Sequence, residues 1–280
     1  MKLPEPKYKV IEPKPHCYVI ELSDGSTIGP LDSVTKVTGI MDKPALVNWS
    51  AREAASYFKR AIEDSNYVIA PEKLEAIAKV AATAHRMKSQ EAKDLGTAAH
   101  DIFHGIVEGK DVVIPYELQA PSKRFSEWYI KSGIEIVATE LIVANKLLKY
   151  GGRLDAIGYR DGKWGIVDYK TSSGFYGNEY AYQVGGYADA VEAQYGIRVS
   201  WAEIARFSKK EPFDCEVRPV TNMAAAMDGF RALREALRLN KDNLLAEVTF
   251  STVEKSKVDK AVKKAKQSVS EKIRTGQVPF

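Results

Sequence analysis

Apolar residues recur along the chain with two different periods, which together predict a mixture of helices and strands. After Pro44 the apolar positions are three and four residues apart, which predicts an amphipathic helix from residue 44 to about 62. Its apolar stripe, which we expect to pack in the core, consists of Val47, Ala51, Ala54, Phe58 and Ile62. Further helices, the first with Pro71 at its N1 position and the last with Thr221 as its N-cap, are predicted over 72–84, 89–107, 121–133, 179–195 and 222–239.

Runs rich in β-branched and aromatic residues predict the strands, in a small edge hairpin within residues 1–30 and over 135–144, 199–207 and 213–220. The most informative stretch is 151–170, where two such runs flank Asp161-Gly162. Asp-Gly between β-rich runs is typical of a two-residue type I′ turn. With these two residues as the loop, Arg160 pairs with Lys163, and the same register continued places Asp155 opposite Asp168.

Two facing carboxylates require an explanation. Paired residues share a face of the sheet, and alternation along the strand puts Lys170 on that face as well. At roughly 5 Å and an effective dielectric constant of about 20, two carboxylates repel by on the order of 3 kcal/mol. A protonated acid, a pairing cation or a metal ion relieves this repulsion, and Lys170 neutralises only one charge. The simplest hypothesis is a divalent-metal site beside a lysine, which suits phosphodiester hydrolysis; the alternative is an exposed hairpin whose acids reach water.

Asp155, followed by Asp168-Tyr169-Lys170, resembles the signature of the PD-(D/E)XK nuclease superfamily, with Leu154 in place of the usual proline. The resemblance implies that the two aspartates and the main-chain carbonyl of Tyr169 bind a metal and that Lys170 is the catalytic lysine. Gly96-Thr97-Ala98-Ala99-His100, on a helix ahead of the hairpin, resembles the RecB-like branch of this superfamily. That likeness implies that His100 is a further metal ligand.

Two further features resemble the same branch. Glu140 lies in an otherwise apolar strand, where a buried acid is costly unless it is paired. The resemblance implies that it orients the lysine or a metal-bound water, whereas the alternative is an edge-strand acid that faces water. Gln183 and Tyr187 lie one helical turn apart and would contact the scissile phosphate or the lysine. The resemblance covers roughly residues 33–195 and is strongest to phage and mitochondrial-type exonucleases.

Composition narrows the class of protein without fixing its substrate. The chain has 280 residues, of which 45% are hydrophobic and 28% charged, as in ordinary globular proteins, and its net charge of +4 permits a polyanionic partner. Cys17 and Cys215 cannot supply the four thiolates of an iron–sulfur cluster, so we expect none. We expect both to be buried in a reducing cytoplasm. Because no run approaches about 18 apolar residues, we expect a cytoplasmic protein, of a bacterium or a virus-infected host cell, that does not contact a membrane.

Basic residues gather in the C-terminal part of the chain. A stripe at helical spacing, which is either a solvated face or a track for phosphates, consists of Arg231, Arg234, Arg238 and Lys241. Residues 254–274 carry eight Lys and Arg against three Asp and Glu, on a pattern with a narrow apolar stripe. We expect a basic amphipathic helix that docks on the body of the protein, on a partner or second copy, or on nucleic acid.

These features predict one α/β domain with a restriction-endonuclease-like mixed sheet flanked by helices. Residues 1–120 would form an N-terminal hairpin and helical region that supplies His100, residues 121–220 the nuclease core, and residues 221–280 the basic C-terminal helices. The predicted activity is that of a Mg²⁺- or Mn²⁺-dependent deoxyribonuclease, an exonuclease that acts on DNA ends or single strands in recombination or repair. Two alternatives stay open: a non-catalytic nucleic-acid-binding protein with this fold, and a zinc hydrolase built on His100 and His104.

Overall fold

The computed structural model describes residues 1–175, 177–242, 259–260, 262–264 and 267. The chain divides into two compact units, 1–239 and 240–280, and the first contains every element named below. The basic helix expected over 254–274 lies, apart from isolated positions, outside the described residues.

The described strands form a single eight-stranded mixed sheet. Its main path runs through β1 (Lys9–Lys14), β2 (Cys17–Glu21), β3 (Thr27–Ser33), β5 (Tyr150–Arg160), β6 (Lys163–Lys170), β7 (Val199–Phe207) and β8 (Cys215–Pro219), and β4 (Glu135–Asn145) also pairs with β5. The β3–β5 and β6–β7 pairs are parallel, and the remaining pairs are antiparallel.

The β5–β6 hairpin has the predicted turn and the predicted register. Asp161 and Gly162 have φ angles of +52° and +77°, the left-handed conformation that a type I′ turn requires at both central residues. Arg160 pairs with Lys163, and the same register continues to Ala156 opposite Val167. The local chemistry of the Asp-Gly pair therefore fixes which residues of the two strands face each other.

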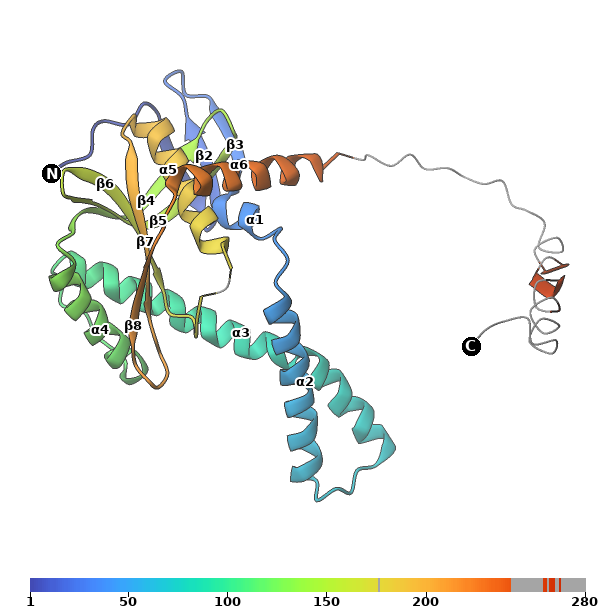
Figure 1. The fold of residues 1–280 in the computed structure, drawn as a ribbon. Helices are drawn as coiled ribbons and strands as arrows, with labels where there is room; N and C mark the ends of the chain where they lie inside the picture. The colour runs from blue at the N-terminus through green and yellow to red at the C-terminus, as the bar shows by residue number, and fades with distance from the viewer. Residues whose placement is uncertain (176, 243–258, 261, 265–266, 268–280) are drawn as a thin grey trace. The chain divides into compact units, whose positions relative to one another are not determined.

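Helices cover both faces of the sheet, and each face has its own apolar core (Figure 1). One core packs α1 (Val34–Thr38), α5 (Glu179–Tyr195) and α6 (Met223–Leu239) against the strands. The other packs the C-terminal part of α3 (Pro71–Val107) and α4 (Tyr116–Ser132) against the opposite face. This is the restriction-endonuclease-like α/β arrangement expected from the sequence.

The starts of two helices differ from the prediction. The N-cap contact of α6 comes from Asn222, whose Oδ1 accepts the N–H of Ala225 at 3.0 Å, and not from Thr221. Helix α4 begins earlier than predicted, at Tyr116, and contains Pro121 in its second turn, where proline has no N–H to donate to the carbonyl of Glu117.

The largest departure from the prediction is the arm formed by α2 (Pro44–Asp64) and the first half of α3. Residues 71–107 form one continuous helix and not two, because residues 85–88 contain neither glycine nor proline. The apolar stripe of α2 is not in the core: all 21 residues of this helix are described and none is buried. Figure 1 shows α2 lying only against α3, away from the sheet.

Two further predictions concern the cysteines and the absence of a membrane-spanning segment. Cys17 is only partly buried and Cys215 is exposed, and both thiols are free, so the prediction of two buried cysteines is wrong. Cys215 is accessible because it begins β8, the edge strand of the sheet. Over the part of the chain that the structure describes, no helix combines the length and the apolar character needed to cross a membrane.

Candidate active site

The candidate site lies at a gap in the sheet along one edge of β5. On that edge β3 pairs with β5 at Tyr150 and Gly151, and β6 pairs with it from Ala156 onward. Among the described strand pairs, none reaches residues 152–155 on this edge. The Asp155–Asp168 position, predicted as a ladder pair, is therefore the first position beyond the ladder. We call this place, where β5 and β6 separate, the fork.

Asp155 supplies a hydrogen bond that the ladder no longer makes. Its Oδ2 accepts the main-chain N–H of Tyr169 at 2.6 Å. The ring of Tyr169 is held from the other side of the strand by a buried aromatic cluster that includes Phe103, Phe125 and Phe207. The main chain of Tyr169, whose carbonyl is an expected metal ligand, is thus fixed next to Asp155.

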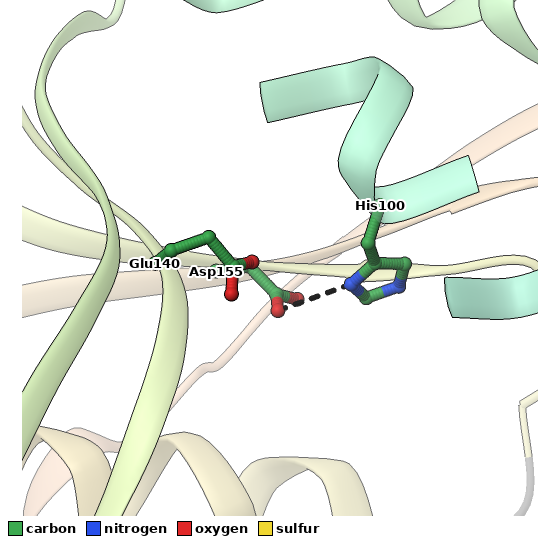
Figure 2. A group of neighbouring side chains, drawn as sticks. All are labelled: His100, Glu140 and Asp155. Carbon is green, nitrogen blue, oxygen red and sulfur yellow. Dashed lines mark hydrogen bonds and ion pairs between the residues drawn. The ribbon is translucent and has the colours of Figure 1, made fainter. Parts of the chain in front are cut away.

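Three side chains from three different elements converge beside the fork (Figure 2). His100 comes from α3, Glu140 from β4 and Asp155 from β5, and one ligand atom of each lies within 4.8 Å of the others. The Nδ1 atom of His100 lies 3.2 Å from Oδ1 of Asp155. Two carboxylates and an imidazole at this spacing are a donor set that suits Mn²⁺ and, through the oxygens, Mg²⁺.

Glu140 reaches this group through an unusual backbone conformation. The register of β4 and β5 places it opposite Asp155, yet its φ angle is +51°. A non-glycine residue in the left-handed region costs on the order of 1–3 kcal/mol and is enriched at functional sites. Burial and the charge of Asp155 raise the pKa of Glu140. The fold thus holds an acid in a strained position where its own charge is disfavoured.

The second half of the site consists of side chains that face α5. Lys170 forms an ion pair with Oδ2 of Asp168, and the Nε2 atom of Gln183 donates to Oδ1 of the same carboxylate at 3.1 Å. Gln183 also lies 3.3 Å from the hydroxyl of Tyr187. The ammonium of Lys170 is 5.2 Å from the ring centroid of Tyr180. Asp168 and Lys170 are therefore fixed as a pair by the first turns of α5.

Burial and neighbouring charges shift the ionisation of all four central groups. Burial raises the pKa of Asp168 to about 6, against the opposing effect of the Lys170 charge. Burial also acts on Asp155, but the charges of His100 and Lys170 outweigh it and lower the pKa of Asp155. The two carboxylates therefore differ. Burial alone would lower the pKa values of His100 and Lys170, yet the adjacent aspartates raise both.

His104 does not join the metal-ligand group. Its Nδ1 atom contacts the hydroxyl of Thr139, and its Nε2 atom lies 3.1 Å from Oε2 of Glu108. Among the described residues, the group of possible metal ligands includes His100 without His104. The i, i+4 histidine spacing thus reflects two separate environments on one helix face.

The basic stripe of α6 is mostly exposed, and Arg234 is its one largely buried member. Arg231 pairs with the buried Asp189, and the side chain of Arg234 is only 11% exposed, with its Nε donating to the carbonyl of Leu148 at 3.0 Å. Arg238 pairs with Glu235 on its own helix, and Lys241 follows the end of α6. Arg231 and Arg234 therefore help to attach α6, while the exposure of Arg231 and Arg238 agrees with a solvated face. The role of the stripe as a track for phosphates stays a prediction.

A cleft of about 1150 Å³ runs from the site to the arm. Its lining includes His100 and Lys170 at one end and Trp49 and Glu53 of α2 at the other. Cations outnumber acids along it: Lys88, Lys93, Lys170, Lys209 and Lys210 against Glu53, Glu91 and Glu117. Burial and the charge of Lys210 lower the pKa of Lys209. An anionic ligand in the cleft would relieve this concentration of positive charge.

Apart from Lys170, the lysines of this cleft were not singled out from the sequence, and neither was Arg153, which contacts Glu140. Lys88 and Lys93 come from α3 and Lys209 and Lys210 from the β7–β8 turn, and only the fold brings these elements together. Arg153 has a local signal, because it precedes Asp155 by two residues and so shares its side of the strand.

The family model described as the PD-(D/E)XK nuclease superfamily matches residues 116–257, half of the chain. No curated protein matches this chain. An alkaline exonuclease from Laribacter hongkongensis is 11% identical, with a TM-score of 0.28 over 53% of this chain and 86% of that one. A candidate exonuclease from Eubacterium rectale is 15% identical, with a TM-score of 0.27 over 78% of this chain and 82% of that one. Similarities this low add nothing to the family match.

The chain belongs to the PD-(D/E)XK nuclease superfamily. It is a nuclease, and its partner is therefore nucleic acid. Nucleases of this superfamily use divalent metals, and His100, Glu140 and Asp155 form a group that could hold one.

Proposed function

We propose that the protein is a Mg²⁺- or Mn²⁺-dependent deoxyribonuclease of the RecB-like branch, an exonuclease that acts on DNA ends or single strands. The observation that carries the proposal is the convergence of His100, Glu140 and Asp155 beside the Asp168–Lys170 pair. It joins potential metal ligands to a lysine at a gap in the sheet, next to a cationic cleft.

Asp155, His100 and Glu140 would hold the cation. Asp168, which is also expected as a ligand from the sequence but lies outside this group in the structure, and the carbonyl of Tyr169 would be further donors. A divalent ion held there would polarise the phosphate and lower the pKa of a water molecule, which would make that water a better nucleophile. The chemistry of the donors fits this role, since carboxylates suit both Mg²⁺ and Mn²⁺ and an imidazole favours the softer Mn²⁺.

Lys170 would stabilise the negative charge that builds on the phosphate oxygens during attack. Its raised pKa keeps the ammonium protonated, which favours this electrostatic role over that of a base. Asp168 and Gln183 restrict where the ammonium can lie, because Asp168 pairs with it and Gln183 holds Asp168. Tyr187 contacts Gln183 and so supports the same arrangement from one turn further along α5.

The cleft supports a single DNA strand as the substrate. Proteins that bind single strands combine a basic groove with aromatic side chains on which bases stack. The cleft provides lysines from both walls together with Trp49, Tyr116 and Phe213, and Tyr116 is 84% exposed. A strand lying there would reach the fork directly, because His100 and Lys170 form the end of the cleft.

Neither alternative gains support from the arrangement of the site. A non-catalytic binding protein would have no need of the strained Glu140 or of the buried Asp168–Lys170 pair, both of which burden the fold. A zinc hydrolase based on both histidines is disfavoured because Thr139 and Glu108 occupy the nitrogens of His104.

The test is cleavage of end-labelled single- and double-stranded DNA with Mg²⁺, Mn²⁺ or Zn²⁺, with Lys170→Met compared to wild type. Lys163→Met is the matched control, because Lys163 is an exposed lysine at the other end of the same strand. We expect Lys170→Met to lose about 10²–10³-fold in cleavage rate while retaining DNA binding in EDTA, and Lys163→Met to cleave normally. Undiminished cleavage by Lys170→Met would overturn the mechanism.

The cleft is tested separately with Lys209→Met/Lys210→Met, using Lys146→Met/Lys149→Met in the β4–β5 turn as the control. Each lost phosphate contact reduces the salt dependence of binding to a single strand by about 0.7 in the log–log slope. We expect weaker single-strand binding and a shallower slope for the first pair only. Equal binding by the two double variants would remove the cleft from the proposal.

A further inference from the structure

Glu140 is held by contacts that the proposed chemistry does not use. One guanidinium nitrogen of Arg153 lies 3.4 Å from Oε2 of Glu140. The other terminal nitrogen forms an ion pair with Glu12, which lies on β1 at the far N-terminal end of the chain. A single planar cation therefore bridges a site carboxylate and the N-terminal hairpin.

The outer end of this bridge is well anchored. The side chain of Glu12 is only 7% exposed, so its carboxylate is contacted mainly by protein groups and not by water. Burial and the nearby charge of Glu12 raise the pKa of Tyr18 to about 12, and the phenol of Tyr18 forms a hydrogen bond with that carboxylate. Tyr18 itself packs beneath β5, where its Cβ would lie 2.9 Å from a Cβ at Gly151. The anchor is thus built into the start of the strand that carries Asp155.

At the inner end of the bridge, Arg153 stabilises the position of the Glu140 carboxylate. Glu140 has a left-handed backbone and faces the negative charge of Asp155. Both effects favour withdrawal of its carboxylate from the group. A guanidinium that reaches Glu140 from the solvent side and is fixed by Glu12 opposes this withdrawal. Arginine suits the task because its rigid fork holds two carboxylates in set directions, which a lysine ammonium cannot do.

We propose that Arg153 is a positioning residue that, anchored by Glu12, fixes Glu140 as a metal donor beside His100 and Asp155. The inference rests on the proposed metal-dependent function. It makes the N-terminal hairpin, which sequence reasoning treats as an edge decoration, a structural part of the active site.

The test is Mn²⁺ binding measured by calorimetry, independently of cleavage. Arg153→Lys is the principal variant because it preserves the positive charge near the cation, so any loss reports geometry and not electrostatics. Arg160→Lys is the matched control, since Arg160 lies on the same strand and pairs with Glu203 in a similarly half-buried setting. Glu12→Gln, which removes the anchor while keeping its shape, guards against a folding defect in Arg153→Lys, and thermal melts accompany each variant.

We expect Arg153→Lys to weaken Mn²⁺ binding about 10-fold or more, in the range found for residues that orient metal ligands. Glu12→Gln should weaken Mn²⁺ binding by less than Arg153→Lys does, and Glu140→Gln should weaken it at least as much. Arg160→Lys should bind Mn²⁺ with wild-type affinity. Wild-type affinity in both Arg153→Lys and Glu12→Gln, or in Glu140→Gln, would overturn the inference alone. Wild-type affinity in His100→Ala and Asp155→Asn would instead overturn the proposed metal site, and the inference with it.

Discussion

The fork and the arm are both built from regularly spaced apolar residues, yet they end in opposite environments. Around the fork, Leu154, Ile157 and Ile166 are completely buried. On the arm, Leu46 and Val47 of α2 are 57% and 65% exposed. The difference is that the strands are covered by helices on both faces, whereas α2 has only α3 to pack against.

The period of apolar residues thus indicates which residues share a face of an element, but not how deeply that face is buried. Two helices that pack only against each other can use a helical apolar stripe and still leave its residues partly exposed. A sheet enclosed by two helical layers buries most apolar positions of its central strands. The resulting close packing fixes the backbone, as a site with donors spaced within a few ångströms requires. The arm, free of that requirement, can present a wall to the cleft.

The sharpest expected contrast is in stability. Leu154→Ala removes a fully buried side chain next to Asp155, and substitutions of this kind cost about 2–5 kcal/mol. We expect the free energy of unfolding, measured by urea denaturation, to fall by that amount. A loss below about 1 kcal/mol would mean that the strand core is loosely packed around Leu154.

The next effect is a pH dependence confined to the fork. The pKa of Asp168 is about 6 and that of His100 is raised above its ordinary value, and both groups must lose a proton to bind a metal. The deprotonated forms therefore dominate above this range and disappear as the pH falls through it. Below pH 6, the Mn²⁺ concentration for half-maximal cleavage should rise about tenfold per pH unit for each of the two groups that must lose a proton. A value that stays constant between pH 7.5 and 5 would contradict the role of these groups.

The smallest expected effect is on the arm. Val47→Ala removes part of a side chain that is 65% exposed, and surface substitutions of this kind usually change stability by less than about 0.5 kcal/mol. Urea denaturation beside Leu154→Ala provides the measurement. A loss comparable to that of Leu154→Ala would show that the arm is buried in solution and would erase the contrast.

Features with local causes could be predicted from the sequence. The Asp161-Gly162 turn sets the hairpin register, and Gly196 ends α5 with a φ angle of +71°. The residues proposed for the site from family resemblance, among them His100 and Asp155, come from separate elements that the fold brings together.

Features with tertiary causes could not be predicted in this way. The end of the β5–β6 ladder depends on β3 entering on the same edge of β5, and the left-handed backbone of Glu140 depends on what surrounds it. The contact between Arg153 and Glu12 joins residues more than a hundred positions apart. The inward direction of Arg234 likewise follows from the placement of α6 against the core and not from its spacing.

The 37-residue helix α3 carries both the arm and His100. At a rise of about 1.5 Å per residue it is a rod roughly 55 Å long, and proline, the usual origin of a sharp kink, is absent after its first position. In the proposed function, a DNA strand bound at Lys88 or Lys93 would contact the same rod that carries His100 near its C-terminal end. Substrate binding beside the arm and the placement of a proposed metal ligand would therefore depend on one rigid element.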